Sequence, residues 1–178
     1  MVRSNCVMRR LILLRHAKSS WADPDLADHD RPLNARGRAA AALMGGWMTG
    51  RGDIPDHVLL SDSARTIETW ALARPALPTA PEGAPTPRLY HADPATMLSV
   101  LHTAPAEART VLLIGHQPGV GGFARKLSNG AVRPSCARAF SHYPTGAAAV
   151  LDFEIDDWKL ADWGGARFTA FVAPKEIG

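Results

Sequence analysis

The sequence predicts an α/β fold, a three-layer α/β/α sandwich with a mostly parallel central sheet. Short apolar runs that suit buried strands alternate along the chain with longer segments of helical character. The clearest runs are Arg10–Leu14, His57–Leu60 and Thr110–Ile114, and each is followed by a helix-like segment. An order of strand, helix and strand favours parallel strands joined by crossover helices.

The first helix is expected over residues 35–49. Asn34 can cap its start, and Gly50 and Gly52 mark its end. Its apolar face is assigned to Leu43, Met44, Trp47 and Met48.

The second strand is followed by a helix that ends by Pro75, because a proline disfavours helical backbone at the residue before it. The candidates for its cap are Ser61, Asp62 and Ser63. The stretch 75–87 is rich in Pro and Ala, and it is expected to be a surface loop because it is too short for a domain linker.

Asp93 and Pro94 predict the start of another helix, with a capping carboxylate followed by proline in the first turn. Its apolar face is assigned to Met97, Leu98 and Leu101. A helix over residues 118–127 follows the third strand, with Val120, Phe123 and Leu127 directed inward. Residues 147–153 and 167–172 are expected to form two late strands.

The composition fits one soluble domain over residues 1–178, with 46% hydrophobic and 21% charged residues. Residues 1–7 carry no pattern and are expected to be an N-terminal extension, since Met8 could be the true start. Arg15 ends the apolar run after Leu14, so this segment is too short for a signal peptide or a membrane span. A cytoplasmic protein without a membrane partner is expected.

The net charge of +3 comes from arginines scattered along the chain, which favours an anionic ligand weakly and nucleic acid hardly at all. Cys6 and Cys136 are too few for a disulfide framework or a zinc site. No metal-ligand spacing is present, so neither a metal nor a cofactor is expected.

Polar residues follow each of the three predicted parallel strands. Arg15 and His16 follow the first, Arg65 lies just after the second, and His116 follows the third. Because ligands bind at the carboxyl ends of the strands in such folds, these side chains are expected to converge at one edge of the sheet.

Two arginines and two histidines in one pocket suit an oxyanion. Arginine forks bind phosphate oxygens in pairs, and the first turn of a helix, where Arg65 lies, also favours an anion. A neutral imidazole can attack phosphorus, and a second, protonated imidazole can stabilise the charge that develops on the phosphoryl oxygens.

Other phosphate chemistries fit less well. The chain has no P-loop motif, neither cysteine is followed by an arginine six positions on, and the Asp23-Pro24-Asp25 motif does not follow an apolar strand. A rival hypothesis is a dinucleotide site at 119–124, which matches the pattern G-x-G-x-x-A. It lacks the acidic residue that such a site needs about 20 positions later, and its glycines lie inside a predicted helix.

The chain resembles the histidine phosphatase (phosphoglycerate mutase-like) superfamily over roughly residues 9–155. The three signature segments are LILLRHAKSSW, SDSARTIETW and VLLIGHQPGV. Three further segments resemble the small SixA-type phosphohistidine phosphatases in particular: DRPLNARG at 30–37, LYHADP at 89–94 and YPTGAAAVLDF at 143–153.

The resemblance implies a phosphoglycerate mutase-like fold and a phosphorylated nucleophile at His16. Arg15, Arg65 and His116 would complete the phosphate pocket. The resemblance also places Lys18 and Ser19 near its mouth.

Four further residues need separate interpretation. His91 could face the pocket or the solvent. Asp93 is the nearest candidate for a general acid, but it is also a ready helix cap. Ala17 stands where the wider superfamily has glycine, and Arg31 is expected to pair with Asp28 or Asp30.

The function expected from these residues is a metal-independent phosphatase that acts on phosphohistidine in a signalling protein. A general phosphomonoesterase for small molecules is one alternative. A non-catalytic module that binds phosphate or a phosphoprotein is another, although pure binding does not require the nucleophile. A mutase is disfavoured because the segment between Arg65 and His116 is short.

Overall fold

Residues 7–178 are described in the computed structural model of the protein, so the extension expected over residues 1–7 lies outside the described chain except for Val7. Seven strands form one sheet, β1 Met8–Arg15, β2 His57–Ser61, β3 Ala84–Thr86, β4 Thr110–Gly115, β5 Ser128–Val132, β6 Ala148–Glu154 and β7 Ala166–Val172. The α-helices are α1 Ala35–Gly50, α2 Ala64–Ala73, α3 Pro94–Leu101, α4 Gly119–Leu127 and α5 Pro134–Ala137.

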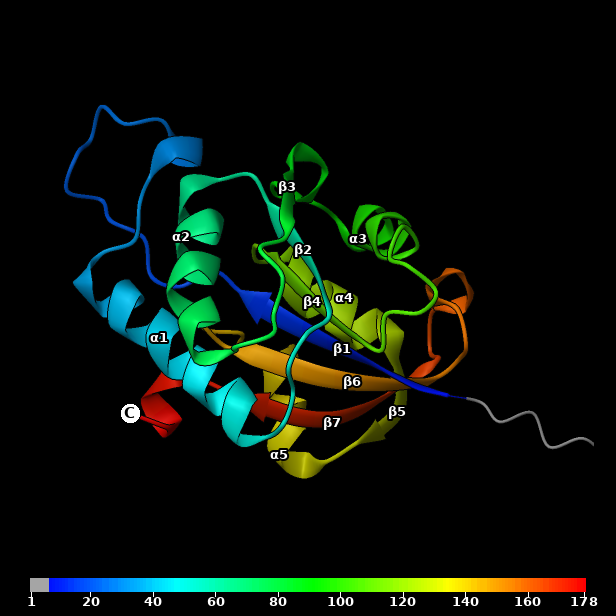
Figure 1. Ribbon diagram of the computed structural model, residues 1–178. Coiled ribbons are helices and arrows are strands. Elements are labelled where there is room, and N and C mark those ends of the chain that lie inside the picture. The colour runs from blue at the N-terminus through cyan, green and yellow to red at the C-terminus, as the bar shows by residue number, and fades with distance from the viewer. Residues whose placement is uncertain (1–6) are drawn as a thin grey trace, which may run out of the picture.

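The sheet has the strand order β3-β2-β4-β1-β6-β7-β5, with β1 at its centre (Figure 1). β3, β2, β4 and β1 are mutually parallel, β6 runs antiparallel to both β1 and β7, and β5 is parallel to β7. The expected mostly parallel sheet is therefore confirmed, with antiparallel pairing limited to the two sides of β6.

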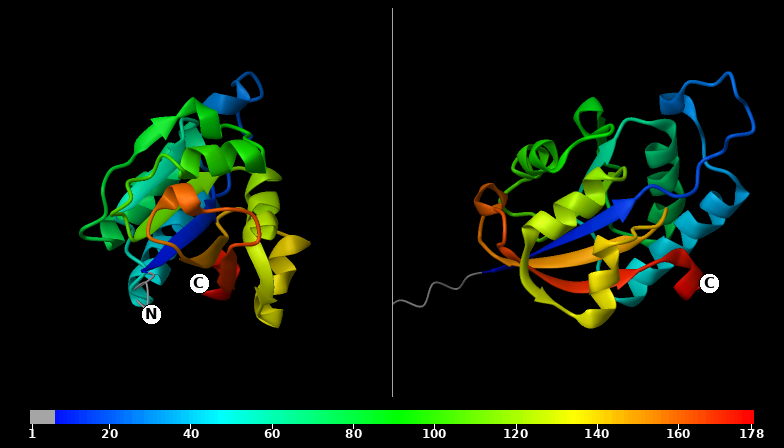
Figure 2. Two further views of the ribbon diagram at one scale, coloured as in Figure 1. Left: turned by 90° about the vertical axis from the view of Figure 1, so that its right-hand side faces the viewer. Right: turned by 180° about the vertical axis from the view of Figure 1, so that it is seen from behind.

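Helices cover both faces of the sheet, as expected for three layers. Side chains alternate along β1, so that Leu11 and Leu13 pack on α3 and α4 while Ile12 and Leu14 pack on α1 and α2. All four side chains are fully buried. Figure 1 shows α1 and α2 on the near face, and Figure 2 shows α4 and α5 in front when the molecule is seen from behind.

Most of the expected elements are present to within a few residues. Asn34 caps α1 by accepting a hydrogen bond from the Gly37 N–H (2.9 Å), and Ser63 occupies the N-cap position of α2. The expected loop at 75–87 is a partial error, because Ala84–Thr86 forms the edge strand β3. An edge strand tolerates proline at 85, since it needs ladder hydrogen bonds on one side only.

Two elements of the second half have no counterpart in the sequence-based prediction. β5 has the polar sequence SNGAV, and α5 is one turn that starts at a proline. Neither shows hydrophobic periodicity, so pairing with β7 defines β5 rather than a local signal.

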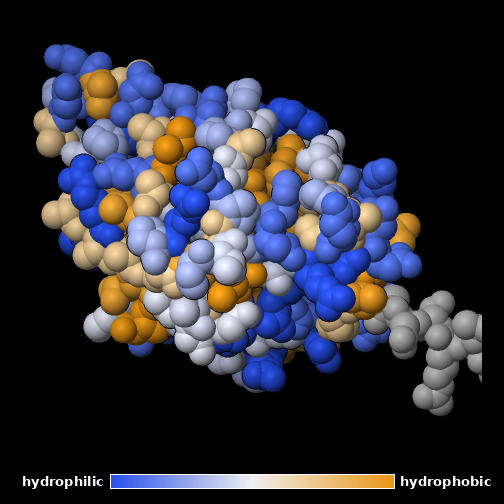
Figure 3. Space-filling model, viewed as in Figure 1, coloured by the Kyte–Doolittle hydropathy of each residue, from blue (hydrophilic) through white to orange (hydrophobic). Residues whose placement is uncertain are grey.

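The apolar face assigned to α1 is wrong at Leu43, which is 40% exposed. The buried stripe of this helix consists of Gly37, Ala41, Met44, Gly45 and Met48. These positions recur every three to four residues, and Leu43 lies off that line. On the surface seen in Figure 3, hydrophobic residues form small separate patches among hydrophilic ones.

Within residues 7–178, no helix is both long enough and apolar enough to cross a membrane.

The contact between α1 and α2 depends on a glycine. A Cβ atom added to Gly45 would lie 2.1 Å from the Ala73 carbonyl oxygen, which is backbone and cannot rotate away. A Cβ atom added to the neighbouring Gly46 would meet nothing within 4 Å.

We therefore expect opposite effects from the two alanine variants. Gly45→Ala should lower the free energy of unfolding by about 1–3 kcal/mol, because the helices must separate. Gly46→Ala should raise it by roughly 0.5–1 kcal/mol, because alanine favours an exposed helix interior. Urea unfolding of both variants measures this, and equal effects at the two positions would contradict the close contact.

Candidate active site

The two histidines predicted to meet lie side by side at the carboxyl ends of β1 and β4. Arg15 is opposite Gly115 in the parallel register, and the His16 N–H donates to the Gly115 carbonyl (3.1 Å). The rings of His16 and His116 are 5.1 Å apart between centroids. Arg65 reaches the same place from the first turn of α2. The structure thus brings together all four residues of the predicted phosphate pocket.

Arg65 fixes the tautomer of His116. Its Nη2 donates to His116 Nδ1 (3.3 Å), and because a guanidinium can only donate, Nδ1 must be the unprotonated nitrogen. His116 Nε2 then carries the hydrogen and donates to Ser61 Oγ (2.9 Å).

Burial is the main cause that lowers the pKa of His116 to about 2, and the neighbouring His16 and Arg65 act in the same direction because each disfavours a second charge beside it. His116 is therefore neutral in the free protein. The protonated second imidazole expected from the sequence is not present in this state.

His16 is held in the form that a nucleophile requires. Its Nδ1–H donates to the Ala17 carbonyl (2.7 Å), which leaves the lone pair on Nε2 free. Burial lowers its pKa to about 4, and the charges of Arg65 and Arg15 act in the same direction. The ring is consequently neutral at pH 7, with Nε2 available to attack.

Arg15 supplies a second guanidinium. Its Nη1 donates to the Tyr143 carbonyl (2.8 Å), but its buried Nε–H has no hydrogen-bond partner among the described residues. The pKa of Arg15 is lowered, mainly by burial and secondly by repulsion from the charge of Arg65. Two crowded guanidinium groups and an unsatisfied buried donor point to an anion as the ligand.

Ala17 fits its position without strain. Its N–H donates to Thr69 Oγ1 (3.0 Å), and its side chain is fully buried. The only non-glycine residue of the described chain with a positive φ is His91, so Ala17 does not need the backbone freedom of the glycine in the wider superfamily.

Asp28 is a site residue that the sequence interpretation missed. It lies in the short 3-10 helix Asp28–Asp30, and its carboxylate Oδ2 accepts from the Tyr90 hydroxyl (2.6 Å), Arg65 Nη2 (3.0 Å) and His91 Nε2 (3.1 Å). The Tyr90 hydrogen bond is the main reason that the pKa of Asp28 is held far below its usual value. The only sequence signal was its place in DHDRPL, where it was considered as a partner of Arg31.

His91 lies beside the pocket residue His116, which is one of the two placements expected for it; the other was the solvent-facing surface. Its ring is 4.8 Å from that of His116 and 4.3 Å from that of Tyr90, and its backbone has a φ of 48°. A histidine held in the left-handed region is uncommon and marks a constrained segment. Asp28 and His91 are exposed and Tyr90 is half-buried, and together they form a rim beside the four pocket residues Arg15, His16, Arg65 and His116, which we call the acidic rim.

Three other candidates have no side-chain hydrogen bond to the four pocket residues among the described residues. Lys18 is exposed and lines a separate hollow with Arg36 and His142, and Ser19 forms a β-bridge with Leu33. Asp93 caps α3 by accepting from the Thr96 N–H (2.7 Å), and this bond lowers its pKa.

The expected carboxylate partner of Arg31 is not found. Arg31 Nη1 donates to the Asp23 carbonyl (2.9 Å), and its guanidinium lies 4.1 Å from the centre of the Trp21 ring. Asp28 is already committed to Arg65, which explains why it does not pair with Arg31.

The glycines of the rival dinucleotide motif lie within α4, which begins at Gly119. A Cβ atom at Gly119 would lie 2.0 Å from the Ala92 carbonyl oxygen. This glycine therefore serves the close approach of α4 to the segment before α3, which is a packing role. Among residues 7–178, no group of three or more His, Cys, Asp or Glu side chains is placed to hold a metal ion.

In this α/β fold, two arginines and two histidines lie together at one edge of the sheet, an arrangement of donors that suits a phosphate-like anion. Residues 11–89 match the model of the histidine phosphatase superfamily (branch 1). An uncharacterised protein of Mycobacterium leprae is 34% identical over 168 residues, which cover 91% of this chain and 100% of the relative.

Solved structures agree with the sequence match. A protein of Nakamurella multipartitia assigned as the phosphohistidine phosphatase SixA has a TM-score of 0.82 at 28% identity, covering 94% of this chain and 96% of its own. One from Agrobacterium tumefaciens, assigned in the same way, has a TM-score of 0.75 at 30% identity, covering 93% and 98%. The chain belongs to the histidine phosphatase superfamily and to its SixA-type branch, and it is a phosphatase.

The protonation states of the site can be tested by following imidazole ¹⁵N resonances with pH. The rings of His16 and His116 should stay neutral at pH 6, and His16 should be half-protonated near pH 4, because burial opposes their charged forms. His29 should titrate in the opposite sense, above the ordinary value of about 6.5, because Asp62 and Asp30 raise its pKa.

The lowered pKa values of His16 and His116 also determine how the free energy of unfolding changes with pH. The unfolded chain binds more protons than the folded one below about pH 6.5, so this contribution destabilises the fold as the pH falls toward 4. Titration of His16 or His116 near pH 6.5 in the folded protein would contradict the assignment.

Proposed function

We propose that this chain is a metal-independent phosphatase that removes the phosphoryl group from phosphohistidine in a signalling protein. His16 Nε2 attacks phosphorus, and the bond from phosphorus to the leaving group breaks with the electron pair going to the leaving group. Water then attacks the phospho-His16 intermediate, which releases phosphate and regenerates the neutral ring. The observation that supports this most directly is the free Nε2 of His16 beside the half-buried Arg15 and the buried Arg65.

The arginines would supply the positive charge that a metal supplies in other phosphoryl-transfer sites. Arg15 has an unsatisfied Nε–H, and Arg65 is held in place by the Asp28 carbonyl (2.6 Å) and carboxylate. Both groups can bind the non-bridging oxygens, whose charge persists through the reaction. A bound phosphoryl group also carries negative charge next to His116, which acts to raise the low pKa of that ring.

The acidic rim supports phosphohistidine as the substrate. The Asp28 carboxylate is 43% exposed and lies beside the rings of Tyr90 and His91. A carboxylate and aromatic faces suit an imidazole ring that becomes cationic or accepts a proton as it leaves. The same carboxylate repels the additional negative charges of many small phosphate esters.

An imidazole leaving group also lessens the need for a general acid. The nitrogen of a phospho-imidazole departs more readily than an alkoxide, which must be protonated as it leaves. Asp93, the candidate acid, is engaged in capping α3, and its lowered pKa keeps it ionised at neutral pH. The structure therefore offers little support for Asp93 as a proton donor.

The covalent intermediate can be tested by rapid acid-free quenching after mixing with a ³²P-labelled substrate. Label should appear on the wild-type protein, resist alkali and be released by acid, and it should be absent from His16→Ala. His142→Ala is the matched control, because His142 is exposed and is not one of the four pocket residues. EDTA should leave labelling unchanged. Label on His16→Ala would identify a different nucleophile, and loss with EDTA would contradict metal independence.

The substrate can be tested by comparing a phosphohistidine protein with p-nitrophenyl phosphate on wild type and Asp28→Asn. The ratio of the two kcat/KM values should favour phosphohistidine in wild type and fall roughly fivefold to tenfold in the variant, about 1 kcal/mol for one partly exposed charge. An unchanged ratio would remove the role of Asp28 in specificity. Activity on p-nitrophenyl phosphate alone would indicate a general phosphomonoesterase. Inactivity on both substrates would indicate a non-catalytic binding module.

A further inference from the structure

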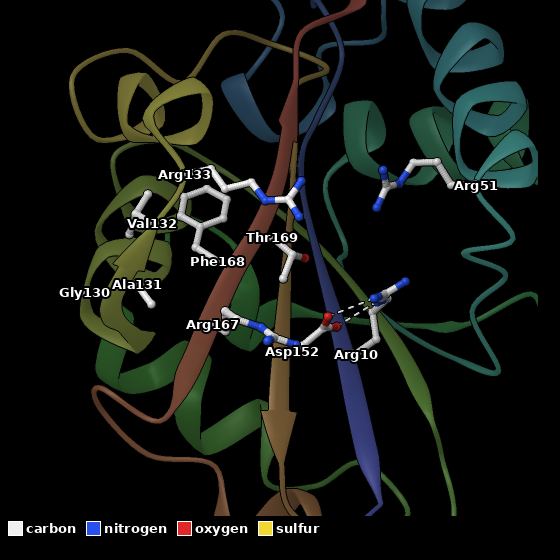
Figure 4. A pocket seen from close by; sticks show the side chains of 10 residues that line it. All are labelled: Arg10, Arg51, Gly130, Ala131, Val132, Arg133, Asp152, Arg167, Phe168 and Thr169. Atoms are coloured by element: carbon white, nitrogen blue, oxygen red, sulfur yellow. Dashed lines mark hydrogen bonds and ion pairs between the residues drawn. The ribbon is translucent and has the colours of Figure 1, made fainter.

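A hollow of about 670 Å³ lies at the end of β1 opposite to the candidate active site (Figure 4). Arg10 and Asp152, which pair across β1 and β6, form part of its floor. Arg10 precedes Arg15 by five strand residues, which places it roughly 16 Å away at about 3.3 Å per residue. The hollow is therefore separate from the pocket around His16.

Two arginines of the hollow are already neutralised. Arg10 donates to both carboxylate oxygens of Asp152 (2.7 and 2.8 Å), and it also pairs with Asp53 (2.5 Å). Arg51 Nε donates to the other oxygen of Asp53 (2.6 Å). Both aspartates are buried, so this network of two arginines and two carboxylates is balanced and fixed.

Two more arginines line the hollow without such partners. Arg133 lies between β5 and α5, and Arg167 is on β7. Within residues 7–178, neither makes an ion pair. Figure 4 shows the guanidinium groups of Arg133 and Arg51 entering from opposite sides of the exposed strands. Four arginines against two aspartates leave two positive charges in excess.

We propose that this hollow is a binding site for a small oxyanion with two phosphate-type groups. Each free guanidinium presents a planar fork that binds one such group through two hydrogen bonds. The volume falls within the range of about 300–1,000 Å³ that is usual for small-ligand sites. Asp152 is the register partner of Arg167 across β6 and β7, but both of its oxygens already accept hydrogen bonds from Arg10, and no ion pair joins it to Arg167. Asp53 is held in the same way by Arg10 and Arg51.

The lining also narrows the class of ligand. Its aromatic residue, Phe168, is only 1% exposed and offers no face on which a nucleotide base could stack. A cation is excluded by the excess of positive charge. The ligand is therefore a compact diphosphate or short polyphosphate, recognised by charge and shape rather than by an attached base.

The proposal can be tested with methylenediphosphonate, which carries two phosphonate groups and has no hydrolysable P–O–P bond. In calorimetric titrations at low salt, wild type should show two sites. Arg133→Gln/Arg167→Gln should lose one of them, with its affinity reduced at least tenfold, and should keep wild-type phosphatase activity. Arg65→Gln should weaken the other site, which belongs to the candidate active site.

The control is Arg88→Gln/Arg109→Gln, which removes the same two charges outside the hollow and should keep both sites. A single site in wild type, or equal losses in the two double variants, would overturn the proposal. Arg133 and Arg167 are exposed, so replacing them should leave the fold intact. Thermal unfolding of the double variant verifies this. This outcome does not depend on the proposed phosphohistidine activity, which is measured on the same samples.

Discussion

The parallel pairing of β1 with β4 is the constraint on which the site depends, because it sets two histidines beside each other at one edge of the sheet. With Arg15 opposite Gly115, the next residue of each strand leaves the sheet at the same height. A shift of one residue would turn one imidazole toward the opposite face. β2 pairs with the other side of β4 and delivers α2, so that Arg65 arrives within hydrogen-bond distance of His116.

Electrostatic crowding follows from that register. Two guanidinium groups and two imidazoles share a poorly hydrated space, and burial is the first cause of the lowered pKa of each histidine. Neutral rings reduce the repulsion, and the neutral form is also the one in which His16 can act as a nucleophile. Asp28 supplies a counter-charge from the rim and holds Arg65 through its carbonyl and its carboxylate. The neutral rings and the Asp28 carboxylate therefore reduce the repulsion between the two guanidinium groups, which stay positioned to bind an anion.

Much of the fold could be predicted because its central strands are apolar on both faces, and because Asn34 and Asp93 are strong capping residues that do cap α1 and α3. The errors occur where tertiary context replaces a local signal. β3 and β5 are edge strands with little apolar pattern, and they exist because β2 and β7 offer free ladder positions. Leu43 is apolar but exposed, since the buried stripe of α1 is set by its contact with α2 and the sheet.

The strand ends and their chemistry could be predicted from the sequence alone, because Arg15-His16, Arg65 and His116 lie at the ends of apolar runs and parallel strands bring their ends to one edge of the sheet. The sequence could not reveal Asp28 or settle the place of His91. These residues reach the site through loops, and loop paths are fixed by distant contacts such as those of Tyr90, Arg65 and the Asp28 carboxylate. Protonation was also decided by the tertiary structure, since the neutral state of both histidines results from burial and from the charges that folding places around them.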